Sequence, residues 1–315
     1  MSTRGRDDAD PAADGSPAVP RSAATTAATL PPAHQPPATP PPATLAPAHQ
    51  PPAILPPAPQ LPAADPFTAL RTLTPARIAL GRCGTGLPTG ALLAFQLAAA
   101  RARDAVHEQF DARRLAAGLA DLESVRVRSR AHSRPVYLQR PDLGRRLEPA
   151  DAAGLARGNW DAAFVIADGL SATAVHAHAL PTLRAVLAQL PREWRIAPVV
   201  IAAGARVALG DEIGERLGAR LVAVLIGERP GLSAPDSLGI YLTWEPRVGC
   251  RDHQRNCISN IRPQGLPYAE AAARLAWLMR AARQQQLTGV LLKDASTVAP
   301  ASSGAPARPA LTPSG

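Results

Sequence analysis

The strongest constraint on the fold is a repeated alternation of short apolar runs and helical segments that begins near residue 161. Runs rich in β-branched and other apolar residues are typical of buried strands, and each is followed by a segment with helical periodicity. Predicted strands span 163–167, 198–202, 220–226, 238–244 and 289–293, and predicted helices span 171–190, 211–217 and 268–285. Because strands that alternate with helices form βαβ units, the predicted fold class is α/β, with a Rossmann-like, largely parallel sheet.

Residues 66–118 are predicted to form a helical N-terminal subdomain. Thr89 is in position to cap a helix after Leu87-Pro88. The apolar stripe of this segment consists of Leu92, Leu93, Phe95, Leu97, Val106 and Phe110. Residues 125–138 contain short alternating runs, Val-Arg-Val-Arg and Val-Tyr-Leu, which predict irregular or edge strands.

The first 65 residues are dominated by Pro and Ala, with 17 prolines. Such a segment has too few large apolar side chains to offset the entropy of ordering, so we expect a disordered arm over 1–65. The same composition predicts a disordered tail over 296–315. The expected domain organisation is therefore this arm, the helical subdomain 66–118, a Rossmann-like domain over 119–295, and the tail.

The net charge is +9, yet Lys293 is the only lysine and 33 of the basic residues are arginines. A basic surface suits nucleic acid or an acidic partner. Biased codon usage accounts for the same composition, since Ala, Pro and Arg are all abundant. The arginines are scattered among acidic residues, and aromatic residues make up only 3% of the chain, too few for base stacking. We expect no nucleic-acid binding.

No apolar run approaches the roughly 18–20 residues of a membrane span, so no membrane association is expected. The N-terminus lacks a charged start followed by an apolar core, which argues against a signal peptide. The three cysteines, Cys83, Cys250 and Cys257, include no closely spaced pair. An odd, unpaired set is typical of a reducing compartment, and the expected location is the cytoplasm.

Three segments, 204–215, 226–232 and 256–263, are predicted as loops that follow apolar runs. Open α/β sheets bind ligands at the carboxyl ends of their strands, where such loops leave the sheet. We therefore expect these loops to share one binding rim. Glu228 follows a predicted buried strand and enters a turn, where its carboxylate can accept hydrogen bonds from a ligand or pair with Arg229 or Arg247. Val207 on the neighbouring loop offers either a ligand contact or ordinary packing.

Other motifs carry less information. Asp168 and Ser171 follow a predicted strand, where they can cap a helix, contact a ligand, or do both. The spacing Gly81-x-x-Gly84-x-Gly86 has the wrong order for a dinucleotide fingerprint and favours a tight turn. His176 and His178 diverge by about 200° on a helix, so they form no metal face. No metal site and no catalytic residue is predicted in this chain, since no zinc spacing, nucleophile elbow or Ser/His/Asp set stands out.

Six collinear segments carry a resemblance to a known family. They are 81–89, 137–146, 167–171, 210–215, 227–232 and 257–261. With these segments the chain resembles the small subunit, or light chain, of ethanolamine ammonia-lyase over roughly residues 70–294. That enzyme converts ethanolamine to acetaldehyde and ammonia with adenosylcobalamin as cofactor.

The resemblance implies a hetero-oligomer in which a large subunit holds the substrate and most catalytic groups. The small subunit then covers the corrin, and the cobalamin contacts fall on Val207, Glu228 and Cys257. No histidine here has Asp two positions before it, which agrees with a cobalamin that keeps its own base on cobalt. Some family members begin with a short helical segment for a bacterial microcompartment, an alternative location that the Pro/Ala arm does not favour. The alternative function is a self-sufficient α/β hydrolase or transferase that uses Asp168 or Glu228.

Overall fold

The computed structural model describes residues 67–74 and 76–296. The predicted arm over 1–65 and all of the predicted tail except Ser296 lie outside the described residues. No helix among the described residues is long and apolar enough to cross a membrane. Along the chain the elements are α1 Thr68–Arg71, α2 Thr89–His107, α3 Ala112–Ala117, β1 Ser124–Arg128, α4 Arg134–Gln139, η1 Leu143–Arg145, η2 Pro149–Gly154, β2 Trp160–Ala167, α5 Ala172–Leu187, β3 Val199–Ala203, α6 Leu209–Leu217, β4 Ala219–Gly227, β5 Leu238–Trp244, η3 Asp252–Gln254, β6 Arg255–Ile261, α7 Tyr268–Gln285 and η4 Gly289–Leu291.

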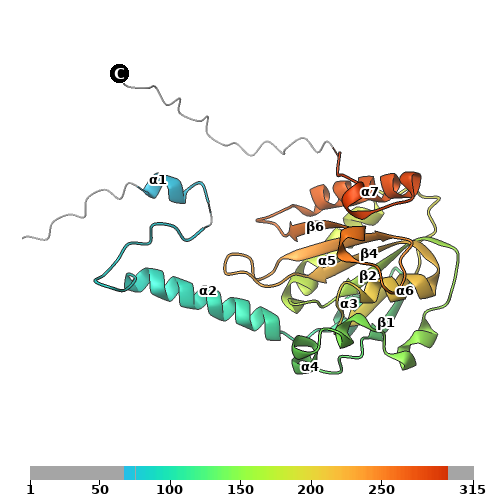
Figure 1. The fold of residues 1–315 in the computed structure, drawn as a ribbon, viewed down its shortest axis with the longest axis horizontal. Helices are drawn as coiled ribbons and strands as arrows, with labels where there is room; N and C mark the ends of the chain where they lie inside the picture. The colour runs from blue at the N-terminus through green and yellow to red at the C-terminus, as the bar shows by residue number, and fades with distance from the viewer. Residues whose placement is uncertain (1–66, 75, 297–315) are drawn as a thin grey trace, which may run out of the picture. The chain divides into compact units, whose positions relative to one another are not determined.

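The fold is α/β around a six-stranded mixed sheet with the strand order β1-β3-β2-β4-β5-β6 (Figure 1). The first four strands in this order are parallel to one another. β5 runs antiparallel to β4, and β6 runs antiparallel to β5. The predicted α/β class is confirmed, but strand 238–244 is not parallel. Only about ten residues join β4 to β5, and a parallel crossover needs a dozen or more.

The two faces of the sheet carry separate apolar cores. Alternate residues of β4 divide between them, with Leu221 and Leu225 on one face and Val222 and Val224 on the other. Buried side chains of α5 and α7 cover the first face, and those of α6 cover the second. β2 and β4 are buried on both faces, as central strands of a parallel sheet are.

Three predictions about secondary structure are wrong. The run 136–138 belongs to α4, because Pro135 lies in its first turn and the Ser133 side chain accepts a hydrogen bond from the Val136 amide. Residues 289–293 form no strand, and η4 occupies 289–291. Its first amide, at Gly289, donates to the Asn256 side chain instead of to a strand ladder. Segment 256–263, predicted as a loop, lies mostly in β6.

The start of α2 also differs from expectation. Pro88, not Thr89, is the N-cap, and no side chain caps this helix. Four large apolar residues on α2, Leu92, Leu93, Phe95 and Leu97, are exposed among the described residues. The predicted tight turn before this helix is confirmed, since Cys83 and Gly86 exchange two backbone hydrogen bonds.

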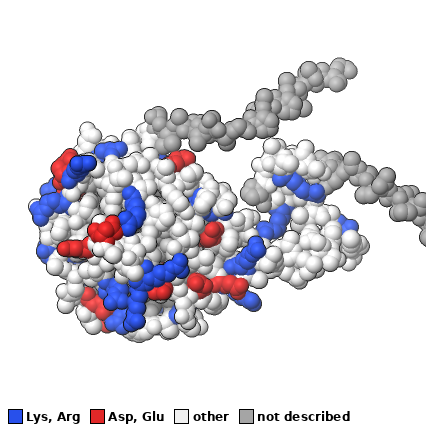
Figure 2. All heavy atoms as spheres, turned by 180° about the vertical axis from the view of Figure 1, so that it is seen from behind, with Lys and Arg blue, Asp and Glu red and all other residues white. Residues whose placement is uncertain are grey.

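Charges on the surface are mixed. On the face drawn in Figure 2, basic side chains gather in several separate groups, and acidic side chains lie beside them. Ion pairs among the described residues include Arg128–Asp151 at 3.0 Å and Arg184–Asp121 at 2.8 Å. Exposed pairs of this kind contribute little to folding, because water and salt screen the attraction.

Candidate functional site

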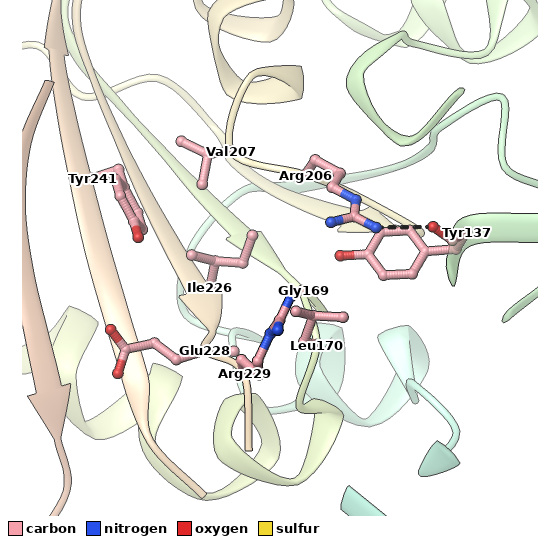
Figure 3. A pocket seen from close by; sticks show the side chains of 10 residues that line it. Tyr137, Gly169, Leu170, Arg206, Val207, Ile226, Glu228, Arg229 and Tyr241 are labelled. Carbon is pink, nitrogen blue, oxygen red and sulfur yellow. Dashed lines mark hydrogen bonds between the residues drawn. The ribbon is translucent and has the colours of Figure 1, made fainter. Parts of the chain in front are cut away.

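A pocket of about 460 Å³ lies where β2, β3 and β4 end at their carboxyl edge (Figure 3). Its lining consists of Tyr137, Gly169, Leu170, Arg206, Val207, Ile226, Gly227, Glu228, Arg229 and Tyr241. The loops after β3 and β4 therefore meet in one site, as expected from the sheet topology. In Figure 3 the Tyr241 hydroxyl and the Glu228 carboxylate lie on one side of the pocket, and Arg206 and Tyr137 lie on the other.

Two glycines let the turn after β2 approach the end of β4. Gly169 has a φ of +56°, and a Cβ there would lie 2.2 Å from the Gly227 carbonyl oxygen. A Cβ on Gly227 would lie 2.1 Å from the Ser171 carbonyl oxygen. The Leu170 amide donates to the Gly227 carbonyl at 2.9 Å. Only glycine fits at positions 169 and 227, and their contact sets the floor of the pocket.

Glu228 is held in one orientation at the edge of the pocket. The Ser237 hydroxyl and the Asn260 amide, at 3.1 Å, both donate to its Oε2 atom. In the described part of the chain these donors, rather than Arg229 or Arg247, are its hydrogen-bond partners. The ion-pair alternative for Glu228 is therefore wrong, and the carboxylate is fixed with Oε1 still able to accept hydrogen bonds.

Cys257 lies next to the pocket rather than in its lining. It sits on β6 directly opposite Tyr241 of β5, so the two side chains share one face of the sheet. Loss of hydration raises the pKa of the Cys257 thiol, while a hydrogen bond from Tyr241 acts in the opposite direction. Desolvation also raises the pKa of Tyr241 above its usual range. Both groups are therefore neutral near pH 7, and the thiol is no activated nucleophile.

Tyr137 and Arg206 form the opposite wall, and Arg134, which is outside the lining, stacks on the same tyrosine ring. The guanidinium carbon of Arg206 lies 4.5 Å from its ring centroid, and that of Arg134 lies 4.8 Å away. Arg206 also donates to the Tyr137 carbonyl at 3.0 Å (Figure 3). Burial raises the pKa of Tyr137 to about 12. Stacking of this kind fixes the planes of the guanidinium groups, and their remaining donors stay available.

Asp168 acts on the loop that carries Val207. Its two carboxylate oxygens accept the amide hydrogens of Gly204, at 3.0 Å, and Ala205, at 2.8 Å. Arg134 lies 3.6 Å from the same carboxylate. Burial raises its pKa to about 6. Ser171, in contrast, caps α5 through the Ala174 amide at 3.2 Å. Ser171 is therefore the residue that caps α5, and Asp168 positions the loop after β3.

The structure brings Val207 and Glu228 into one lining and places Cys257 across a strand from that lining. Sequence reasoning missed Tyr137, Arg206 and Tyr241. A signal was present, because the chain has only three tyrosines and two of them line this pocket. Among the described residues no group of three or more His, Cys, Asp and Glu side chains could hold a metal ion. His176 accepts from the Asp111 amide and His178 contacts Tyr268, so the two histidines diverge as expected.

The chain is similar to known proteins over most of its length. The family model described as ethanolamine ammonia-lyase light chain matches residues 64–293. The chain is 56% identical over 244 residues to the ethanolamine ammonia-lyase small subunit of Azotobacter vinelandii, a match that covers 75% of this chain and 90% of that protein. It is 56% identical over 243 residues to the Pseudomonas putida small subunit, covering 74% and 89%. The Ralstonia nicotianae small subunit is 54% identical over 243 residues, covering 74% and 90%.

Proposed function

This chain belongs to the family of ethanolamine ammonia-lyase light chains, and on that premise we propose that it is the cofactor-enclosing subunit of a two-subunit carbon–nitrogen lyase. The reaction converts ethanolamine to acetaldehyde and ammonia. A large subunit supplies the substrate site, and this chain assembles with it as a hetero-oligomer. Within this chain, residues 119–295 are the cobalamin-contacting domain.

The cofactor of this proposal is adenosylcobalamin, and the pocket residues fit such a group. A corrin ring carries amide side chains around its edge, and these donate and accept hydrogen bonds. Glu228 offers an oriented acceptor, and the buried Arg206 Nε has no hydrogen-bond partner in the described structure. The pocket is far smaller than a whole cobalamin, so this chain covers one edge of the ligand. A second protein surface is needed to enclose the rest.

The roles of the three expected contacts follow from where they lie. Glu228 accepts amide hydrogens of the corrin side chains, and Ser237 keeps it pointed at them. Val207 packs against the apolar part of the ring edge. Cys257 supports Tyr241 from the neighbouring strand and presents a neutral sulfur beside the ligand. When bound, adenosylcobalamin supplies radical chemistry through homolysis of its cobalt–carbon bond.

In this proposal the large subunit holds the substrate and this chain covers the cofactor, so the chain needs no catalytic residues of its own. A reactive radical needs a site closed to water, and a subunit that covers the ligand provides that closure. Asp168 contributes indirectly, because it fixes the loop that carries Val207. The observation that carries the proposal is the meeting of Val207 and Glu228 in one pocket of a chain in this family.

The decisive experiment combines this chain, a co-purified large subunit, adenosylcobalamin and ethanolamine, and follows acetaldehyde. We expect product when both chains are present and none when either is left out. Steady turnover by this chain alone would refute the proposal and favour the hydrolase or transferase alternative. A complex that forms but yields no acetaldehyde would assign the chain to a lyase for a different amino alcohol.

A further inference from the structure

A second pocket of about 410 Å³ adjoins the first and is rich in arginine. It is lined by Arg145, Arg206, Val207, Ala208, Tyr241, Cys250, Arg251, Asp252 and Arg255. Arg206, Val207 and Tyr241 belong to both linings. A ligand held at Glu228 can therefore extend past Val207 into this second pocket.

The charge of this pocket is only partly compensated. Arg255 is paired with Asp211 at 2.5 Å, and Asp252 lies 3.6 Å from its Nε atom. Arg145, Arg206 and Arg251 have no carboxylate partner within the described residues. Three uncompensated guanidinium groups around one concave surface create a strong positive potential, and a bound anion would relieve it.

The N-terminus of α6 adds to this potential. The helix begins at Leu209, and no side chain caps it at Ala208. The amides of Val207 and Ala208 donate no hydrogen bond within the described chain. The two acids of its first turn are already engaged, Asp211 by Arg255 and Glu212 by Arg216 at 3.2 Å. Free amides and the positive end of the helix dipole therefore face the same pocket as the arginines.

Buried donors without partners point to a missing acceptor. The Nε atoms of Arg206 and Arg255 are buried and make no hydrogen bond. The Arg255 side chain is only 2% exposed. Buried donors of this kind are rare in folded proteins unless a ligand or water completes them.

From these observations we propose that the pocket of Arg145, Arg206 and Arg251 binds a phosphate-class anion, and that its occupant is the phosphodiester of adenosylcobalamin. This inference rests on the proposed function. Arginines that converge from several elements match the several oxygens of a phosphate better than a single carboxylate. Adenosylcobalamin carries one phosphodiester, in the arm that joins its base to the edge of the corrin. Such an arm extends away from the ring, as the second pocket extends away from Glu228.

The test uses the two-subunit complex and two cofactors that differ in the phosphodiester. Adenosylcobinamide retains the corrin and the adenosyl group but lacks the phosphodiester and the base. The double variant Arg145→Gln/Arg251→Gln removes two exposed guanidinium groups, and we expect it to keep the fold because neither side chain is buried. Arg220→Gln, on the amino end of β4, is the matched control. Dissociation constants are measured by equilibrium dialysis with absorbance detection.

We expect the double variant to bind adenosylcobalamin roughly 10- to 100-fold more weakly than the wild-type complex, as is typical for loss of charged hydrogen bonds. Its affinity for adenosylcobinamide should change less than about twofold, because that ligand makes none of these bonds. The control variant should bind both ligands as the wild type does. Equal affinities of the double variant and the wild type for adenosylcobalamin would overturn the proposal, as would an equal loss for both ligands.

Competition with inorganic phosphate distinguishes two possible occupants of the pocket, the phosphodiester of adenosylcobalamin and free phosphate. If the phosphodiester fills the pocket, phosphate competes with adenosylcobalamin and leaves adenosylcobinamide binding unchanged. If phosphate has the same affinity for the free complex and for the adenosylcobalamin-loaded complex, the phosphodiester does not occupy the pocket. That result would overturn the proposed occupant and assign the pocket to free phosphate. Loss of subunit assembly in the double variant would overturn the proposal in favour of a protein contact.

Failure of the proposed function gives a different pattern. In that case the wild-type complex binds neither adenosylcobalamin nor adenosylcobinamide. Phosphate titration by calorimetry then decides the pocket separately. Phosphate binding that is present in the wild-type complex and absent in the double variant supports the anion site. Absence of phosphate binding to the wild-type complex overturns it.

Discussion

Ser237 and Glu228 bond to each other twice across the short connection between β4 and β5. The Glu228 amide donates to the Ser237 carbonyl at 2.9 Å, and the Ser237 hydroxyl donates to the Glu228 carboxylate. The second bond orients the acceptor that we assign to the cofactor. Glu228→Ala should therefore weaken adenosylcobalamin binding by the two-subunit complex roughly 10- to 100-fold. Ser237→Ala, which frees the carboxylate to rotate, should weaken it less. Equilibrium dialysis measures both, and an unchanged affinity in Glu228→Ala would contradict the role of this residue.

Asp168 should make the stability of the chain depend on pH. Its pKa in the folded chain, about 6, exceeds the value of an unfolded aspartate, so the folded state binds more protons between those pKa values. The stabilising contribution is complete below the unfolded pKa and is lost as the pH rises through about 6. The unfolding free energy of the wild type minus that of Asp168→Asn should therefore fall by at most about 3 kcal/mol from pH 4 to pH 7.

Urea unfolding at a series of pH values measures this difference. Asp142→Asn provides the control, because Asp142 is exposed and pairs with Arg140, which holds its pKa below the usual range. That variant should show no such fall. A difference between the wild type and Asp168→Asn that stays flat across the range would disprove the link to Asp168.

Gly169→Ala should destabilise the chain by more than about 3 kcal/mol, because it combines a positive φ with a clash against the Gly227 carbonyl. Gly84→Ala separates the two effects. Gly84 has a φ of +61°, and nothing lies within 4 Å of the position its Cβ would take. Its cost should be limited to conformational strain of about 1 kcal/mol. Thermal and urea unfolding give both values, and equal costs would show that the close approach is unimportant.

The Asp211–Arg255 pair should be far more costly to break than to replace. Arg255→Met leaves the Asp211 carboxylate buried without its partner and should cost about 3–5 kcal/mol of folding stability. The double variant Asp211→Leu/Arg255→Met removes both charges and should cost less than the single one. A double-mutant cycle by urea unfolding measures the coupling. Additive costs would indicate that the two residues do not interact.

Exposed leucines of α2 should contact the large subunit. Leu93 and Leu97 are 58% and 53% exposed and lie one helical turn apart, a patch that a partner surface would bury. Leu93→Asp/Leu97→Asp should raise the dissociation constant of the two-subunit complex at least about tenfold. Gln96→Asp adds the same kind of charge to the same helix and should have little effect. Sedimentation analysis measures assembly, and similar constants for all three proteins would refute the contact.

Much of the fold could be read from local patterns. Apolar runs with β-branched residues gave β2, β3, β4 and β5, because strands buried on two faces need apolar side chains at successive positions. Helical periodicity gave α7 at its observed bounds, and Ser171 marked the start of α5. The family membership also follows from the sequence, since six motifs in order span most of the chain. The strands and helices among these features are specified mainly by neighbours along the chain.

The set of side chains that meet in the pocket could not be predicted from local sequence, because tertiary structure brings them together. Cys257 was expected in a loop but lies in β6 opposite Tyr241, and this pairing is set by an antiparallel register that no local pattern specifies. Tyr137 and Arg206 are 69 residues apart in sequence and meet only because α4 packs beside the loop after β3. The sequence by itself determined the family and most of the strands and helices, but it misassigned α4, β6 and residues 289–293. Which side chains face one another across the pocket was decided by strand order and register, because these come from contacts between residues distant in the chain.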